Sequence, residues 1–209
     1  MNKNFILINH PLLKRDVTIL RNKNTDTESF RAALQRISNI LAAEISREFS
    51  LKEIKTETPL ELTTGSELAT EIILVPVLRA GLGMVNGFLQ IIPEAKVGHI
   101  GLQRNEETLA PEQYYYKVPK NLDTAFVIMV DPMLATGGSA SEALKYLKKR
   151  EAKKIFFACV VAAPKGVSKI QTDHPDVKIF SAALDRELND KGYILPGLGD
   201  AGDRTFGTL

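Results

Sequence analysis

The sequence predicts an α/β domain in which helices flank a mostly parallel central sheet. Dense apolar runs such as "EIILVPVL", "TAFVIMV" and "KIFFACVVAA" have the composition of strands that are covered on both faces. Segments with a helical period separate these runs, and this alternation is typical of a parallel sheet. The chain has 209 residues, enough for one domain with a substantial core, and it contains no repeat, low-complexity segment or linker.

The first third of the chain is expected to contribute a short strand, a long helix and an exposed strand. The short strand is the apolar segment 5–8. Thr25 and Glu28 have the spacing of a capping box. From Phe30 onward, apolar residues recur every three or four positions, which places them on one face of a helix. The alternating segment 52–63 predicts an exposed strand that leads into a polar loop.

The rest of the chain supplies the central sheet and its helices. Further strands are expected at residues 71–78, 95–105, 112–119, 124–130, 154–163 and 177–184, and further helices at 81–92, 139–150 and 165–173. The tail, residues 193–209, is rich in glycine and lacks a helical period. It is therefore expected to be either a frayed terminus or a functional loop.

Composition and charge exclude several classes of function. A formal net charge of +2 does not mark a nucleic-acid-binding protein. The single cysteine, Cys159, cannot form an internal disulfide, and its apolar surroundings predict a buried thiol. His10, His99 and His174 lack the spacing of metal ligands or of a catalytic triad, so each is expected to be structural. No apolar run approaches the length of a membrane span, and we expect a cytoplasmic protein without membrane contact.

The stretch "VIMVDPMLATGGSASEAL" predicts a phosphate site at the carboxyl end of a strand, where parallel sheets bind their ligands. The small residues 135–139 allow backbone N–H groups to converge at the start of a helix, which suits a phosphate monoester. Thr136 and Ser139 can add hydroxyl donors, and Asp131 can accept hydrogen bonds from sugar hydroxyls. The alternative is a plain strand-to-helix turn capped by Ser139.

Two arginines also follow predicted strands. Arg79 comes after "EIILVPVL", and Arg104 comes after "GHIGLQ". A guanidinium at such a position can bind an anion with two parallel hydrogen bonds. The alternative for each arginine is a surface salt bridge, but that interpretation is weaker for the pair together with a phosphate loop.

Two glycine motifs do not fit a nicotinamide-dinucleotide site. Glycines 81, 83 and 87 are spaced one residue too widely. The segment "GLGDAG", residues 197–202, matches the fingerprint in its letters, but only seven residues follow it. We therefore expect neither a helix nor a second strand to complete the unit, which argues against a nicotinamide-dependent oxidoreductase. No Walker A loop occurs.

The motif "VIMVDPMLATGGSA" resembles the 5-phosphoribosyl-1-diphosphate (PRPP) motif of type I phosphoribosyltransferases. Most of these proteins have two successive acids, whereas Pro132 replaces the second one here, as in uracil phosphoribosyltransferases. "PVLRAGLGM" and "YILPGLGDAGDRTFGT" are similar to that family too, so the resemblance extends from His10 to the C-terminus. It implies one domain, residues 1–209, with a core at about 60–185, a hood formed by the terminal segments, and a projecting β-arm. Residues 113–119, "QYYYKVP", resemble that arm.

The resemblance implies transfer of the phosphoribosyl group from PRPP to N1 of uracil, giving UMP and diphosphate, as in pyrimidine salvage. Catalytic roles fall on Arg79 and Arg104 at the diphosphate, Asp131 at the ribose hydroxyls, and Asp200 at PRPP through Mg²⁺. The implied PRPP-binding residues are Arg79, Arg104, Asp131, Pro132, Met133, Leu134, Ala135, Thr136, Gly137, Gly138, Ser139 and Asp200. The implied uracil-binding residues are Ile194, Gly199, Asp200 and Ala201. Because Pro132 replaces an acid, Mg²⁺ is expected to be held mainly by the diphosphate and Asp200.

The resemblance further implies a homodimer or homotetramer, and GTP as an effector in some members; the sequence reveals no effector site. Two other functions remain open for this fold. A phosphoribosyltransferase-like RNA-binding regulator of pyrimidine genes would need a basic face, against which the +2 charge argues. A purine phosphoribosyltransferase would differ in the base that it accepts.

Overall fold

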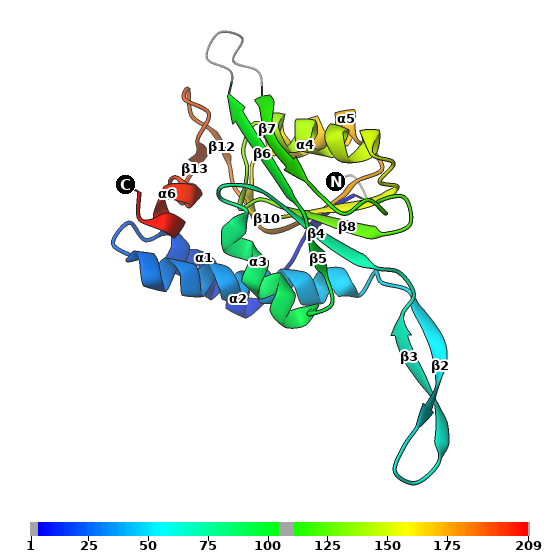
Figure 1. Cartoon of the computed structure of the whole chain (residues 1–209). Coiled ribbons are helices and arrows are strands. Elements are labelled where there is room, and N and C mark those ends of the chain that lie inside the picture. Colours follow the sequence, from blue (N-terminus) through cyan, green and yellow to red (C-terminus); the bar gives the residue numbers. More distant parts are fainter. Residues whose placement is uncertain (1–3, 105–110, 209) are drawn as a thin grey trace.

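The protein is built on a mostly parallel sheet between two layers of helices (Figure 1). The computed structural model describes residues 4–104 and 111–208. Within these residues the sheet has nine strands: β1 (Phe5–Leu7), β4 (Ile72–Leu78), β5 (Lys96–Val97), β6 (His99–Arg104), β7 (Pro111–Lys117), β8 (Phe126–Val130), β9 (Met133–Leu134), β10 (Lys154–Ala162) and β11 (Lys178–Leu184). Its main path runs β1-β11-β10-β8-β4-β6-β7, and only the β6–β7 pair along it is antiparallel. The predicted fold class is confirmed.

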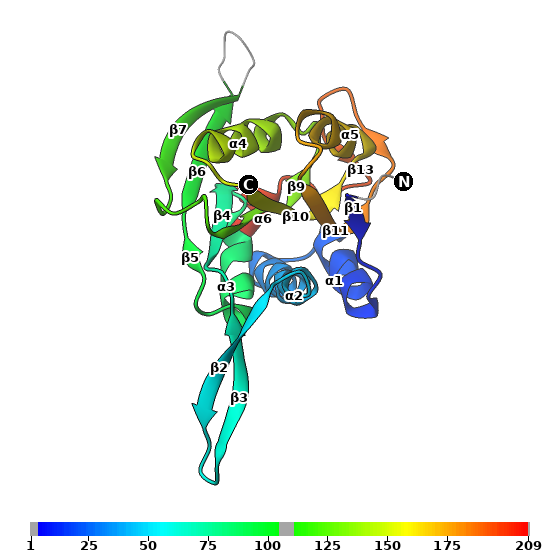
Figure 2. The ribbon, with the colours of Figure 1, turned by 90° about the vertical axis from the view of Figure 1, so that its right-hand side faces the viewer.

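The two faces of the sheet are covered by different helices (Figure 2). One face carries α1 (Pro11–Arg21), α2 (Thr27–Ser46) and α3 (Leu82–Ile91), and the other carries α4 (Gly138–Lys149) and α5 (Pro164–Asp173). Strand residues alternate between two apolar clusters, so that Ile128 packs with the first group of helices and Val127 with the second. This two-sided burial explains the dense apolar runs of the strands. None of the helices in the described ranges has the length and hydropathy needed to cross a bilayer.

The long helix α2 has the predicted apolar face but a different start. Asp26 is the N-cap, and its carboxylate accepts a hydrogen bond from the Ser29 amide at 2.7 Å. The predicted capping box of Thr25 and Glu28 was therefore wrong. The Thr25 hydroxyl instead donates to the Ile19 carbonyl at 2.7 Å and closes the turn that follows α1.

The projecting arm is not the segment that resembled it. Strands β2 (Leu51–Glu57) and β3 (Leu62–Leu68) form a separate antiparallel hairpin that extends away from the domain (Figure 1). Residues 113–119 instead belong largely to β7, which pairs with β6 at the edge of the main sheet. One exposed strand was expected over residues 52–63, followed by a polar loop; the structure instead turns between β2 and β3, and the polar residues that follow position 63 belong to β3. This segment becomes a strand because its backbone pairs with β2 rather than because it buries side chains.

The C-terminal part of the chain lies over the carboxyl ends of β4 and β8. It comprises the short pair β12 (Glu187–Leu188) and β13 (Ile194–Leu195), followed by α6 (Ala201–Phe206). The expectation that no helix would complete the "GLGDAG" unit was wrong, because α6 begins inside it: Asp200 caps the helix by accepting from the Asp203 amide at 2.9 Å. The division of residues 1–209 into a core and a hood stays a prediction.

Candidate functional site

The predicted phosphate loop connects β8 to α4. Gly137 is the N-cap of α4 and has a φ of 80°, a conformation that favours glycine. Ser139 lies inside the helix, so the alternative of a turn capped by Ser139 was wrong. The Gly138 amide approaches the Thr136 hydroxyl at 3.4 Å, a long hydrogen bond. The first turn of α4 thus presents amide groups and a positive dipole end without a side-chain cap.

Helix α5 packs closely against this loop. A Cβ atom added to Gly166 would lie 2.5 Å from the Ala135 carbonyl oxygen and 2.8 Å from that of Leu134. A Cβ atom on Gly137 would in turn lie 3.0 Å from the Gly166 carbonyl oxygen. Both glycines are required by close backbone approach, and the packing holds the loop in one shape before any ligand binds.

Asp131 and Asp200 border one cavity of about 260 Å³ between the phosphate loop and the C-terminal segment. Its wall includes Ala135 on one side, and Ile194 and Ala201 on the other. Burial of the Asp131 carboxylate raises its pKa to about 7; the Met133 amide, which donates to it at 3.2 Å, acts in the opposite direction, and the charge of Asp200 adds to the increase. The structure therefore brings together carboxylates that are 69 positions apart in the sequence, 200 − 131.

The raised pKa of Asp131 predicts a specific pH dependence. Between the pKa of an unfolded aspartate, about 4, and about 7, the folded protein holds a proton that the unfolded chain releases. The stability of the ligand-free protein should therefore fall as pH rises through this window. The predicted role of Asp131 as acceptor for the ribose hydroxyls of PRPP further implies that PRPP affinity should rise, since the ionised carboxylate is the stronger acceptor. Thermal unfolding and PRPP titration from pH 5 to 8 measure both trends. Asp131→Asn should show neither pH trend. If the pH profiles of the variant and the wild type ran parallel, Asp131 would not be the titrating group.

Arg79 follows β4 directly and points to the C-terminal segment. Its guanidinium donates to the Asp203 carboxylate at 3.0 Å, and a Cβ atom on Gly202 would lie 3.8 Å from the same Arg79 nitrogen. The Thr208 hydroxyl and Arg79 both lower the pKa of Asp203. Arg79 thus forms the surface salt bridge that was the alternative interpretation, and its guanidinium lies beside Gly202. The side chain of Arg104 lies outside the described residues.

The predicted uracil loop is fixed through its backbone. Gly197 donates its N–H to Asp185 at 2.8 Å, and its carbonyl accepts from Arg21 at 3.0 Å. Arg21 also binds both carboxylate oxygens of Asp185, at 2.8 and 2.5 Å. A Cβ atom on Gly197 would lie 2.2 Å from the Ile194 carbonyl oxygen. The turn between Ile194 and Gly199 is thus defined by one guanidinium–carboxylate pair.

Arg204 ties the same loop to the N-terminal helices. It donates to the carbonyls of Leu198 at 2.8 Å, of Asn22 at 2.7 Å, and of Leu20. Its guanidinium lies 4.5 Å from the centre of the Phe30 ring. Arg204, Arg21 and Asp185 were not predicted from the sequence, because their partners are far away in the chain. The one local signal is that Asp185 directly follows β11, at the carboxyl end of a parallel strand.

Two of the histidines, the cysteine, and the serine beside one of these histidines have structural surroundings outside this site. Ser141 donates to Asp173 at 2.6 Å, and Nε2 of His174 lies 3.0 Å from the Ser141 carbonyl. Since that nitrogen faces a carbonyl oxygen, it carries the hydrogen and cannot take a proton from the serine. His10 caps α1 by accepting from the Leu12 amide, and burial raises the pKa of Cys159 to about 12. Across the described ranges no three His, Cys, Asp or Glu side chains gather as metal ligands.

Solved structures identify the class of fold. A hypoxanthine phosphoribosyltransferase from Trypanosoma cruzi matches with a TM-score of 0.53 at 10% identity, over 76% of each chain. A hypoxanthine-guanine phosphoribosyltransferase from Bacillus anthracis matches with a TM-score of 0.51 at 13% identity, over 76% of this chain and 80% of the other. The fold is that of a type I phosphoribosyltransferase.

Sequence comparison narrows this class to one family. The family description "Uracil phosphoribosyltransferase" matches residues 7–208. Proteins of that name from Salinibacter ruber and Bacillus cereus are 53% identical over 206 residues and 52% identical over 203 residues, covering 99% and 97% of this chain and 98% and 97% of their own. A solved structure from Aquifex aeolicus is 40% identical with a TM-score of 0.92, over 97% of both chains. The chain belongs to the uracil phosphoribosyltransferase family, which favours a transferase over the RNA-binding regulator.

Proposed function

We propose that the 260 Å³ cavity is where the family reaction takes place, with one substrate at each side. The reaction is the transfer of the phosphoribosyl group from PRPP to N1 of uracil, giving UMP and diphosphate. The observation that carries the assignment is that one cavity is lined both by Asp131 and Ala135 and by the segment from Ile194 to Gly202. A sugar phosphate bound on the first side would have its anomeric carbon facing a base bound on the second.

The loop residues Ala135, Thr136, Gly137, Gly138 and Ser139 bind the 5-phosphate, with Pro132, Met133 and Leu134 as the backbone that leads into it. Asp131 accepts from the ribose 2- and 3-hydroxyls. Arg79 and Arg104 bind the diphosphate, where negative charge develops as the anomeric bond breaks. The position of Arg79 next to Gly202 supports this role, because it lies at the side of the cavity opposite the phosphate loop.

The donor set fits Mg²⁺. Asp131 and Asp200 present carboxylate oxygens to the same cavity, and the charge of Asp200 disfavours ionisation of Asp131 unless a cation is bound. Mg²⁺ would be held by Asp200 together with diphosphate oxygens, and it supplies neutralisation of the leaving group. The protein itself holds the ribose at Asp131 and limits motion of the loop that carries Asp200.

Backbone groups of Ile194, Gly199, Asp200 and Ala201 recognise uracil. A carbonyl and an N–H match the N3–H and O4 of uracil, whereas cytosine reverses both groups and would leave buried polar groups unpaired. We therefore predict that kcat/KM for cytosine is lower by a factor on the order of 10⁴. The fixed turn at Gly197 supports this selectivity, because a rigid loop cannot rearrange to suit the wrong base.

The decisive assay measures diphosphate release from PRPP with uracil, cytosine and hypoxanthine in turn, with and without Mg²⁺ and GTP. Among the three bases, we expect only uracil to support diphosphate release. Equal kcat/KM for uracil and cytosine would overturn the uracil loop, and preference for hypoxanthine would favour the purine alternative. Rates that do not depend on Mg²⁺ would refute the proposed role of the metal. Rates that do not change with GTP would refute GTP as an effector of this enzyme.

The chain is further proposed to act in the cytoplasm as a homodimer or homotetramer. The β2–β3 hairpin supports self-association, since Leu51, Leu60 and Leu62 are 63%, 95% and 71% exposed on it. Exposed leucines on a projecting hairpin offer apolar contact area to a second copy of the chain. Sedimentation equilibrium measures the assembly, and a monomer at micromolar concentration would contradict this proposal.

A further inference from the structure

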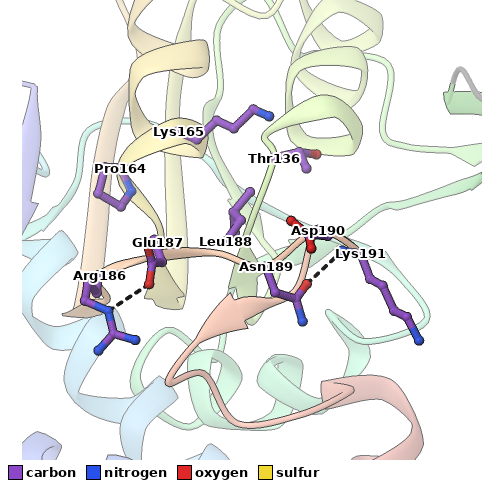
Figure 3. A pocket seen from close by; sticks show the side chains of 10 residues that line it. Thr136, Pro164, Lys165, Arg186, Glu187, Leu188, Asn189, Asp190 and Lys191 are labelled. Carbon is purple, nitrogen blue, oxygen red and sulfur yellow. Dashed lines mark hydrogen bonds and ion pairs between the residues drawn. The ribbon is translucent and has the colours of Figure 1, made fainter.

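A second, larger pocket lies on the other side of the phosphate loop (Figure 3). Its volume is about 880 Å³, and it is formed by the start of α5, Thr136, and residues 186–192. Gly192 borders both this pocket and the 260 Å³ cavity. Because Thr136 lines the pocket and Ala135 lines the cavity, the phosphate loop is accessible from two sides. Side chains of the larger pocket can therefore reach a ligand that is bound on the loop.

Lys165 is the cation of this pocket that is suited to such a contact. It precedes Gly166, whose backbone packs on the phosphate loop, and its side chain extends toward Thr136 (Figure 3). Within residues 4–104 and 111–208 its ammonium group has no ion-pair partner. Arg186 is paired with Glu187 at 2.9 Å. Lys191 points away from Thr136 (Figure 3).

We propose that Lys165 binds the 5-phosphate of PRPP and of the product UMP. This inference rests on the proposed function of the phosphate loop. The loop offers amide and hydroxyl donors, which carry no full charge, whereas a phosphate monoester carries nearly two negative charges at neutral pH. A lysine on a flexible stem supplies a point charge from the side that the loop leaves open.

The position of Lys165 distinguishes the two anionic ends of PRPP. Lys165 and Thr136 line the same pocket, whereas Arg79 is paired with Asp203 beside Gly202. Lys165 therefore binds the 5-phosphate, which PRPP shares with UMP, and not the diphosphate leaving group.

Lys165→Ala tests the proposal through inhibition constants as well as turnover. We expect KM for PRPP and the inhibition constant for UMP both to rise about tenfold, as expected for the loss of one charge-assisted hydrogen bond. The inhibition constant for diphosphate and KM for uracil should not change. Lys165→Arg should retain most of the affinity, and Lys165→Glu should lose more than alanine does.

Lys191→Ala is the matched control, because it removes a cation from the same pocket that points away from Thr136. An equal loss of UMP affinity in both alanine variants would refute a contact and indicate a general effect of charge. Unchanged UMP affinity in Lys165→Ala, with an active wild-type enzyme, would overturn this inference alone. A wild-type protein that releases no diphosphate from PRPP and uracil would overturn the proposed function itself.

Discussion

Replacing Arg79 with alanine is expected to lower kcat/KM for PRPP by about 10²–10³-fold, the effect of removing one group that stabilises developing negative charge. The fold should survive. The Arg79 side chain is 57% exposed, and its ion pair with Asp203 is of the exposed kind that contributes about 0–1 kcal/mol. A large loss of activity with a small loss of stability separates a ligand-binding arginine from a structural one.

Steady-state kinetics and thermal unfolding of the same preparations provide the measurement. Asp203→Asn is the matched control, since it removes the partner of Arg79 and leaves the guanidinium in place. Arg79→Lys keeps the charge without the paired donors and should fall between wild type and alanine. Near-wild-type kinetics for Arg79→Ala would contradict the proposal that Arg79 binds the diphosphate.

Asp185→Asn is expected to lower the free energy of unfolding by about 3 kcal/mol, at the low end for breaking a buried ion pair, because Arg21 is partly exposed. The Asp185 side chain is only 4% exposed, and it accepts from both Arg21 and the Gly197 amide. The same change releases the turn at Gly197, so KM for uracil should rise while KM for PRPP changes little.

Asp16→Asn is the control that separates stability from positioning. Asp16 is fully buried and binds Arg15 and Arg36 at 3.0 and 2.9 Å, and those hydrogen bonds lower its pKa against the effect of burial. It belongs to α1 and its ion pairs do not involve the uracil loop. Both variants should unfold at lower denaturant concentration, but only Asp185→Asn should raise KM for uracil. Equal changes in KM would mean that the Asp185 effect is a general loss of stability.

The elements that the sequence predicted well are those with a strong local signal. Strands β4, β8 and β10 appear as unbroken apolar runs because both of their faces are covered. The loop between β8 and α4 could be located because its glycines and small residues lie within a few positions of the helix start, whereas its role as a phosphate site stays a prediction. Strand β3 and helix α6 were missed because β3 is polar and α6 is short, and their pairing or packing partners lie elsewhere. Helix α1 was also missed, although Pro11 at its start and the spacing of Leu13, Val17 and Leu20 are local helix signals.

The sequence by itself determined the α/β class, the longer strands of the sheet, and the start of α4 after the glycines that follow Asp131, because these depend on periodicity and on residues that are neighbours in the chain. Only the tertiary structure decided which hairpin projects, that Asp131 and Asp200 share a cavity, and that Arg21 and Asp185 fix Gly197. The Arg21–Asp185 pair joins residues 164 positions apart. Burial and long-range contacts of this kind exist only once the chain has folded, and they determine the pKa of Asp131 and the shape of the uracil loop.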